Sequence, residues 1–110
     1  MSYLNHRGKF WRQYPEYVAA FNECRRVGTA HAAGDSLRAM YASLIVFQLG
    51  LGEKYAPKLF AWLRRYDSDR AVGAEAQSLM RNEVAVWDLI THGPTAGAVY
   101  PVKEAPCQDG

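Results

Sequence analysis

The sequence predicts an all-α protein: a small four-helix domain with a helical hairpin and an extended C-terminal tail. Three observations support this prediction. Apolar residues mostly recur at steps of three and four, and the alternation typical of strands is scarce. Proline and glycine stand where helices are expected to begin and end. The chain of 110 residues fits one domain, and its 49% hydrophobic and 22% charged content is ordinary for a globular protein.

The first helix is expected to begin at Pro15, because the fixed φ of proline suits the first helical position. Gly28 weakens this helix but need not end it. Gly34 is expected to stop it, and Asp35 to cap the next helix, so the joint is short and predicts a helical hairpin. One face of the first helix carries residues at helical spacing, namely Tyr14, Tyr17, Phe21, Cys24, Gly28 and His31.

Three further helices are expected, over residues 36–49, over residues 57–66 and from about residue 68 to residue 92. The last one carries Glu83 in the middle of its apolar face, where a buried carboxylate needs a basic partner. The domain thus covers residues 1–92, with an N-terminal arm over residues 1–14 and a Pro/Gly-rich tail over residues 93–110.

The second helix is unusual because the fourteen residues between Arg38 and Glu53 carry no charge. A membrane-spanning helix needs roughly 20 apolar residues, so this run is too short to cross a membrane. On a helical wheel the larger side chains share one broad face, which is expected to be the core. That face consists of Leu37, Met40, Tyr41, Leu44, Ile45, Phe47 and Leu51.

The opposite side of this helix carries small and apolar residues, and two explanations compete for it. The helix is either surrounded by its own domain or in contact with another chain. The second explanation is favoured, because three other helices, one of them short, do not easily surround a central helix, and exposed apolar surface marks interfaces. A homodimer or a protein partner is therefore expected, with an interface formed by Ala39, Tyr41, Ala42, Ser43, Val46 and Leu49.

The uneven distribution of charge along the chain suggests nucleic-acid binding as an alternative function. Residues 1–66 hold ten Lys/Arg against four Asp/Glu, and residues 67–110 hold three against seven. The N-terminal segment "HRGKFWRQY" places basic residues beside aromatic ones, which suits nucleic acid. The net charge of +2 is small, however, so a solvated basic face is favoured over nucleic-acid binding. The alternative contact set would be Arg7, Lys9, Arg12, Lys54, Lys58 and Arg65.

No catalytic, cofactor or metal motif is present, so we expect neither an enzyme nor a cofactor. Cys24 and His31 are seven residues apart, about 10 Å along a helix, which is too far for them to share a metal ion. The His–Asp pairs at helical spacing lack a neighbouring nucleophile. With two cysteines in unrelated contexts and no secretory signal at the N-terminus, a reduced, cytoplasmic protein is expected.

The segment "SLRAMYASLIVFQLGLG", together with the chain length and the low cysteine content, resembles the small bacterial anti-activators of LuxR-type quorum-sensing regulators. This resemblance implies a non-enzymatic protein that occupies the dimerisation surface of a transcriptional regulator and keeps it off DNA. It transfers no residue role. The function predicted from the sequence is therefore non-catalytic regulation by protein–protein binding.

Overall fold

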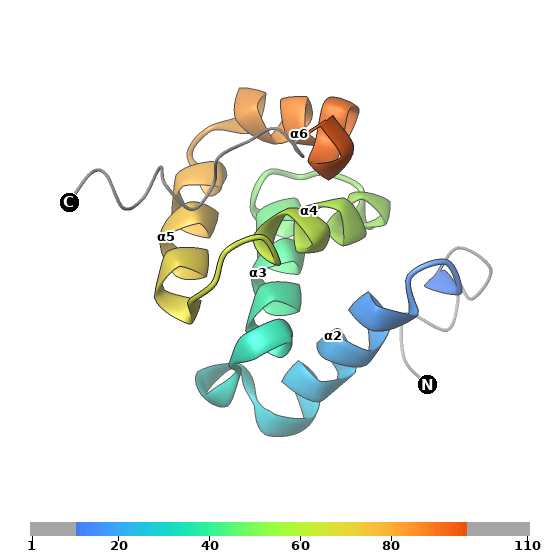
Figure 1. Cartoon of the computed structure of the whole chain (residues 1–110), viewed down its shortest axis with the longest axis vertical. Coiled ribbons are helices and arrows are strands. Elements are labelled where there is room, and N and C mark those ends of the chain that lie inside the picture. The colour runs from blue at the N-terminus through green and yellow to red at the C-terminus, as the bar shows by residue number, and fades with distance from the viewer. Residues whose placement is uncertain (1–10, 97–110) are drawn as a thin grey trace.

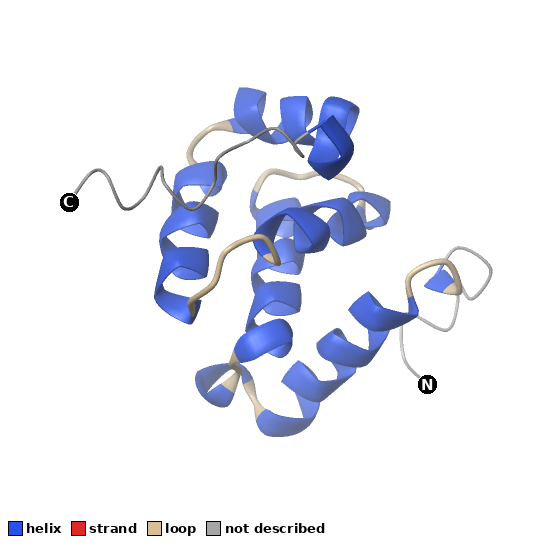
Figure 2. Ribbon diagram, viewed as in Figure 1, coloured by secondary structure: helices blue, strands red, loops and turns tan. Residues whose placement is uncertain are grey.

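The computed structural model describes residues 11–96, and the side chains of residues 11–92. This part of the chain holds five α-helices and two 3₁₀ turns, and it contains no strand (Figure 2). The all-α prediction is confirmed. The elements are α2 (Pro15–Val27), η2 (Thr29–His31), α3 (Gly34–Gln48), η3 (Glu53–Tyr55), α4 (Ala56–Leu63), α5 (Asp69–Met80) and α6 (Glu83–Ala96).

Helix α3 is the central element. Helices α2, α4 and α5 all pack against it, and α6 packs on α4 and α5 at one end of the domain (Figure 1). The described residues form one hydrophobic core, in which Ile45, Leu59, Leu63, Val72 and Val86 have the largest fully buried side chains. These five residues come from α3, α4, α5 and α6, so the core joins most of the helices.

Helices α2 and α3 form the predicted helical hairpin, but the joint differs from the prediction. Helix α2 ends at Val27, because Gly28 adopts φ +91°, a conformation that favours glycine. Helix α3 begins at Gly34, so its N-cap residue is Ala33 rather than Asp35, and Ser36 at the third helical position bonds back to Ala33. The Ser36 hydroxyl donates to the Ala33 carbonyl oxygen at 2.7 Å and accepts from the Ala33 N–H at 3.2 Å.

The predicted fourth helix is two helices, α5 and α6. The Ser68 hydroxyl caps the first by accepting from the Ala71 N–H at 3.1 Å. The Asn82 side chain accepts from the Ala85 N–H at the same distance, which is the usual arrangement at a helix start. Glu83 therefore lies in the first turn of α6 and is exposed, so its predicted burial is wrong; it accepts from Trp87 Nε1 at 3.2 Å.

A buried cation connects the start of α3 to the segment between α4 and α5. Arg38 is only 7% exposed, and its Nη2 donates to the Tyr66 carbonyl oxygen at 2.6 Å. Its Nη1 lies 3.3 Å from the Asp69 carboxylate, which also accepts from the Gly34 N–H at 3.2 Å. The charge of Arg38 is thus compensated within the chain, as a buried charge requires.

The described helices also bear on whether the chain could span a bilayer, which requires a long and predominantly apolar helix. Among residues 11–96, none combines the length and the apolar character that crossing a membrane demands.

Candidate functional site

The side of α3 that was predicted to bind another chain is largely buried within this chain. Ala39 and Ala42 are 0% exposed and Val46 is 3% exposed, so the prediction is corrected at these three positions. Small side chains let α2, α4 and α5 approach α3 closely, and these helices fill the space that was assigned to a partner. The other three predicted residues, Tyr41, Ser43 and Leu49, are half-buried.

Two of these half-buried residues contact neighbouring helices of the same chain. The Ser43 hydroxyl shares a hydrogen bond with the Tyr17 hydroxyl of α2. The Tyr41 hydroxyl lies 3.5 Å from the position that a Cβ on Gly73 of α5 would occupy. Tyr41 and Ser43 therefore mark the borders of the buried side, where α5 and α2 meet α3.

The side of α3 that was predicted to be core is only partly so: Leu37, Tyr41 and Leu51 are half-buried and pack against the core, whereas one line of residues is turned toward solvent. Phe47 is 81% exposed and Leu44 is 38% exposed, and Met40 is half-buried. These residues follow the spacing i, i+4, i+7, so they lie on one line along the helix. We call Met40, Leu44 and Phe47 the apolar strip. Of the residues expected in this face, Ile45 alone is fully buried.

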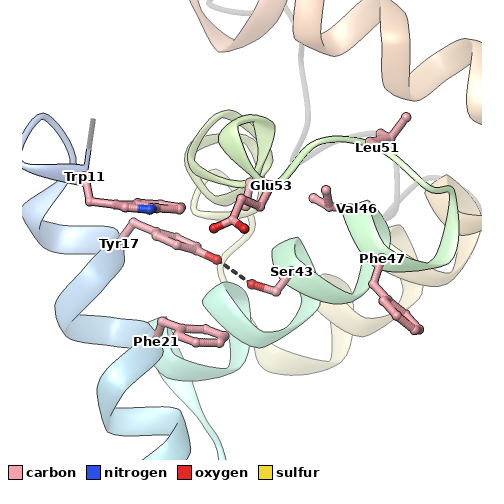
Figure 3. Close-up of a pocket in the computed structure, with 9 residues that line it drawn as sticks. Trp11, Tyr17, Phe21, Ser43, Val46, Phe47, Leu51 and Glu53 are labelled. Carbon is pink, nitrogen blue, oxygen red and sulfur yellow. Dashed lines mark hydrogen bonds between the residues drawn. The ribbon is translucent and has the colours of Figure 1, made fainter. Parts of the chain in front are cut away.

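A pocket of about 300 Å³ adjoins the apolar strip at Phe47 (Figure 3). It lies between α2, α3 and η3. Three rings from the N-terminal side of the molecule are stacked beside it: the centroids of Trp11 and Tyr17 are 5.2 Å apart, and those of Tyr17 and Phe21 are 6.0 Å apart. We call this space the aromatic pocket; its lining residues are Trp11, Tyr17, Phe21, Ser43, Val46, Phe47, Leu51, Glu53 and Ala56.

Three oxygen-bearing side chains face the otherwise apolar interior of the aromatic pocket. The hydroxyls of Tyr17 and Ser43 share their hydrogen bond there, and the Glu53 carboxylate points toward them (Figure 3). Burial raises the pKa of Tyr17 to about 12, so its hydroxyl is protonated at neutral pH. Desolvation also raises the pKa of Glu53 above its ordinary value. The pocket therefore offers hydrogen-bond acceptors in apolar surroundings.

Cys24 and His31, which were considered as metal ligands from the sequence, do not line the aromatic pocket. No group of three or more His, Cys, Asp or Glu side chains among the described residues is placed to hold a metal ion. Cys24 is buried and desolvation raises its pKa, which disfavours the reactive thiolate. His31 lies on the exposed turn η2. The described surface does present the apolar strip beside a pocket with a few polar groups.

The basic residues of the nucleic-acid alternative that fall in the described part of the chain have different surroundings. Arg7 and Lys9 lie outside the described residues, and Arg12 is exposed. Lys58 Nζ donates to the Ile90 carbonyl oxygen at 3.4 Å. Lys54 lies over the ring of Tyr55, and Arg65 over the ring of Trp62, at 5.2 Å and 5.6 Å from the ring centroids. Nucleic-acid binding therefore stays a prediction.

Comparison with known proteins gives no information on the function of this chain. No protein-family model, curated protein or solved structure matches the chain.

The aromatic pocket was not predicted from the sequence. Tyr17 and Phe21 were placed on one helical face, but nothing in the pattern connects them to Glu53, which lies more than thirty residues away along the chain.

Proposed function

We propose that this chain is a non-catalytic regulatory protein that acts by binding another protein through the apolar strip and the aromatic pocket. The observation that carries the proposal is the 81% exposure of Phe47 at the mouth of an apolar pocket. A large aromatic side chain held in water beside a concave apolar surface is the arrangement found at the centre of protein interfaces.

The energetics of such a contact are favourable. Complete burial of one large apolar side chain contributes about 1.5–3 kcal/mol, so covering Phe47 and Leu44 together would supply several kcal/mol toward association. The strip lies on a regular helix, so little conformational entropy is lost when a partner covers it. A partner helix laid along α3 would cover all three strip residues, because they are spaced by whole helical turns.

We propose two candidates for the partner. The resemblance to anti-activators makes the dimerisation surface of a LuxR-type transcriptional regulator the first candidate. A second copy of this chain is the other, since two apolar strips are equivalent surfaces that would pack against each other in a homodimer. Sedimentation of the purified chain separates these cases, because a homodimer formed through the strip needs no further protein.

The test is retention of a partner from native lysate, treated with nuclease and washed at high salt. Tagged wild-type protein is compared with Phe47→Ser and with Val84→Ser. The latter is a matched control, because Val84 is 80% exposed but lies on α6. We expect a discrete protein that wild type and Val84→Ser retain and Phe47→Ser loses. High salt should not weaken it, because apolar burial is insensitive to screening.

Two outcomes would contradict this proposal. Equal retention by Phe47→Ser, with an unchanged helical circular dichroism spectrum, would remove the strip from the contact. If retained material disappears at high salt from all three proteins and contains nucleic acid when the nuclease is omitted, then the basic residues would become the functional surface instead.

A further inference from the structure

The surface around Phe47 carries both a projecting side chain and a cavity. Phe47 is 81% exposed, and its ring is turned away from the stacked rings of the aromatic pocket that it borders (Figure 3). The pocket, of about 300 Å³, is large enough to hold an aromatic ring. Its apolar walls come from α2 and from the chain between α3 and the start of α4, namely Phe21, Val46, Leu51 and Ala56. The same face thus presents an apolar group and an apolar space that suit each other.

A surface of this kind can pair with a second copy of itself. In a dimer with a two-fold axis every contact occurs twice, because both copies contribute the same surface. If the axis passes between Phe47 and the aromatic pocket, Phe47 of each copy lies over the pocket of the other. Both rings then leave water together, so the contact is reciprocal.

The distribution of charge suits a second copy at this surface. Near a two-fold axis a charged side chain meets its own equivalent, and like charges that face each other are unfavourable. The fourteen residues between Arg38 and Glu53, which include Leu44 and Phe47, carry no charge. The Glu53 carboxylate points toward Tyr17 rather than toward Phe47 (Figure 3). Unlike partners are commonly selected by complementary charges, which this uncharged stretch does not offer.

Resting on the protein-binding function proposed above, we propose that the partner at this surface is a second copy of the chain, with Phe47 of each copy inserted into the aromatic pocket of the other. The ring would contact Phe21, Val46 and Leu51 of the second copy. Leu44, one helical turn before Phe47, would lie at the edge of the contact. The paired surfaces are covered, so a transcriptional regulator would bind only the dissociated copy, and self-association would regulate that binding.

The dimer is expected to be weak and reversible. Its centre consists of two Phe47 rings and two pockets, whereas stable interfaces bury roughly 1,600 Å² in total and transient ones less than about 1,200 Å². A weak dimer is what the proposed regulation requires, because a foreign partner that binds the single copy can then displace the second copy by mass action.

Sedimentation equilibrium of the purified full chain, over a range of concentrations, tests the pairing. Wild type should pass reversibly from the mass of one chain to that of two, and Phe47→Ser should stay monomeric. Val84→Ser is the matched control, because Val84 is 80% exposed on α6 and should not affect the dimer. A wild-type chain that stays monomeric up to about 1 mM would overturn the proposal, and so would equal association of Phe47→Ser.

A mixing experiment tests the insertion of Phe47. Leu51→Trp and Phe21→Trp each enlarge a wall of the pocket while Phe47 stays in place, so each variant alone should associate weakly. A 1:1 mixture of Phe47→Ser with either of them combines an open pocket with an intact Phe47. Because one of the two contacts is restored, the mixture should associate roughly tenfold or more tightly than its components. A mixture no tighter than its components would overturn the insertion.

The insertion can also be measured without a variant, in case a larger side chain in the pocket disturbs the fold. In a mixture of isotope-labelled and unlabelled wild-type chains, isotope-filtered NMR detects contacts between copies only. We expect an NOE between the Phe47 ring of one copy and the Ala56 methyl group of the other. Its absence under conditions in which the chain is dimeric would overturn the proposed geometry. Helical circular dichroism establishes whether each variant used above is folded.

Failure of this inference is distinguishable from failure of the proposed function. Sedimentation of the pure chain measures self-association, whereas retention from lysate measures binding of other proteins. If the pure chain stays monomeric but retention still depends on Phe47, protein binding stands and the second copy fails. If the chain dimerises through Phe47 and the lysate yields no other protein, the second copy stands and the foreign regulator fails. A monomer without any retained protein would overturn both.

Discussion

The two sides of α3 are not sorted by the size of their side chains, although Ile45 on the side with larger residues is fully buried. The side with small residues, Ala39, Ala42 and Val46, is in the core, whereas Leu44 and Phe47 face water. Small residues are buried because they let helices cross closely, and three helices do so here. The comparison teaches that, on an uncharged helix, burial follows the crossing of neighbouring helices rather than the bulk of the side chains.

The largest expected effect comes from placing the same charge on each side of α3. Val46→Arg should lower the free energy of unfolding by more than about 3 kcal/mol, because it buries an unpaired charge in a packed core. Phe47→Arg, one residue further on, should change it by less than about 1 kcal/mol, because the position is exposed. Chemical denaturation followed by circular dichroism measures both. A folded, equally stable Val46→Arg would refute the assignment of the buried side.

The next largest effect on stability is expected from Tyr17 of α2. Its hydroxyl is hydrogen-bonded to the Ser43 hydroxyl of α3. The pKa of Tyr17 is raised to about 12 by burial, above the unfolded value near 10. The neutral hydroxyl is therefore favoured in the folded state, so this stabilisation is complete below pH 10 and is lost as the pH rises through 10 to 12. At pH 12 the free energy of unfolding should be lower than at neutral pH by roughly 2–3 kcal/mol.

Alkaline denaturation of wild type and Tyr17→Phe provides the measurement. The variant should lose part of the decrease in stability between pH 10 and 12. A remaining decrease is expected from Tyr66, whose pKa burial also raises. Identical alkaline profiles for the two proteins would show that the Tyr17 hydroxyl is not desolvated.

A smaller effect should come from changing side-chain volume on each side of α3. Ala42→Leu should lower the free energy of unfolding by about 1–3 kcal/mol, because extra methylene groups force the crossing helices apart. Leu44→Ala removes volume on the exposed side and should cost less than about 1 kcal/mol. Thermal unfolding of both variants would sharpen the comparison. A larger loss in Leu44→Ala than in Ala42→Leu would contradict it.

The smallest effect is a gain in stability where α5 meets the border of the buried side. A Cβ at Gly73 would lie 3.5 Å from the Tyr41 hydroxyl, an ordinary contact. Gly73→Ala should therefore raise the free energy of unfolding by about 0.5–1 kcal/mol through helix propensity. Gly50→Ala is the control with the opposite sign, because Gly50 adopts φ +71°. Destabilisation by Gly73→Ala would mean that α3 and α5 are closer than described.

Local signals in the sequence predicted the fold class and several helix starts. Pro15 marks the start of α2 because proline needs no hydrogen-bond partner at a first helical position. Asn82 is a local signal of the same kind, because asparagine is a favoured N-cap residue and its side chain accepts from the Ala85 N–H at the start of α6. The exposed side of α3 was not predictable in this way, because no charged residue between Arg38 and Glu53 marks the side that faces water. The aromatic pocket depends on contacts between distant segments, which periodicity does not record.

The Asp69 carboxylate has a consequence for how the domain opens. It accepts from the Gly34 N–H at the start of α3 while it belongs to the first turn of α5. Fraying of one helix end therefore removes a hydrogen-bond acceptor from the other, so the two ends should open together rather than independently. In native-state hydrogen exchange, the first turns of α3 and α5 would then behave as one cooperative unit, although thirty-five residues separate them along the chain.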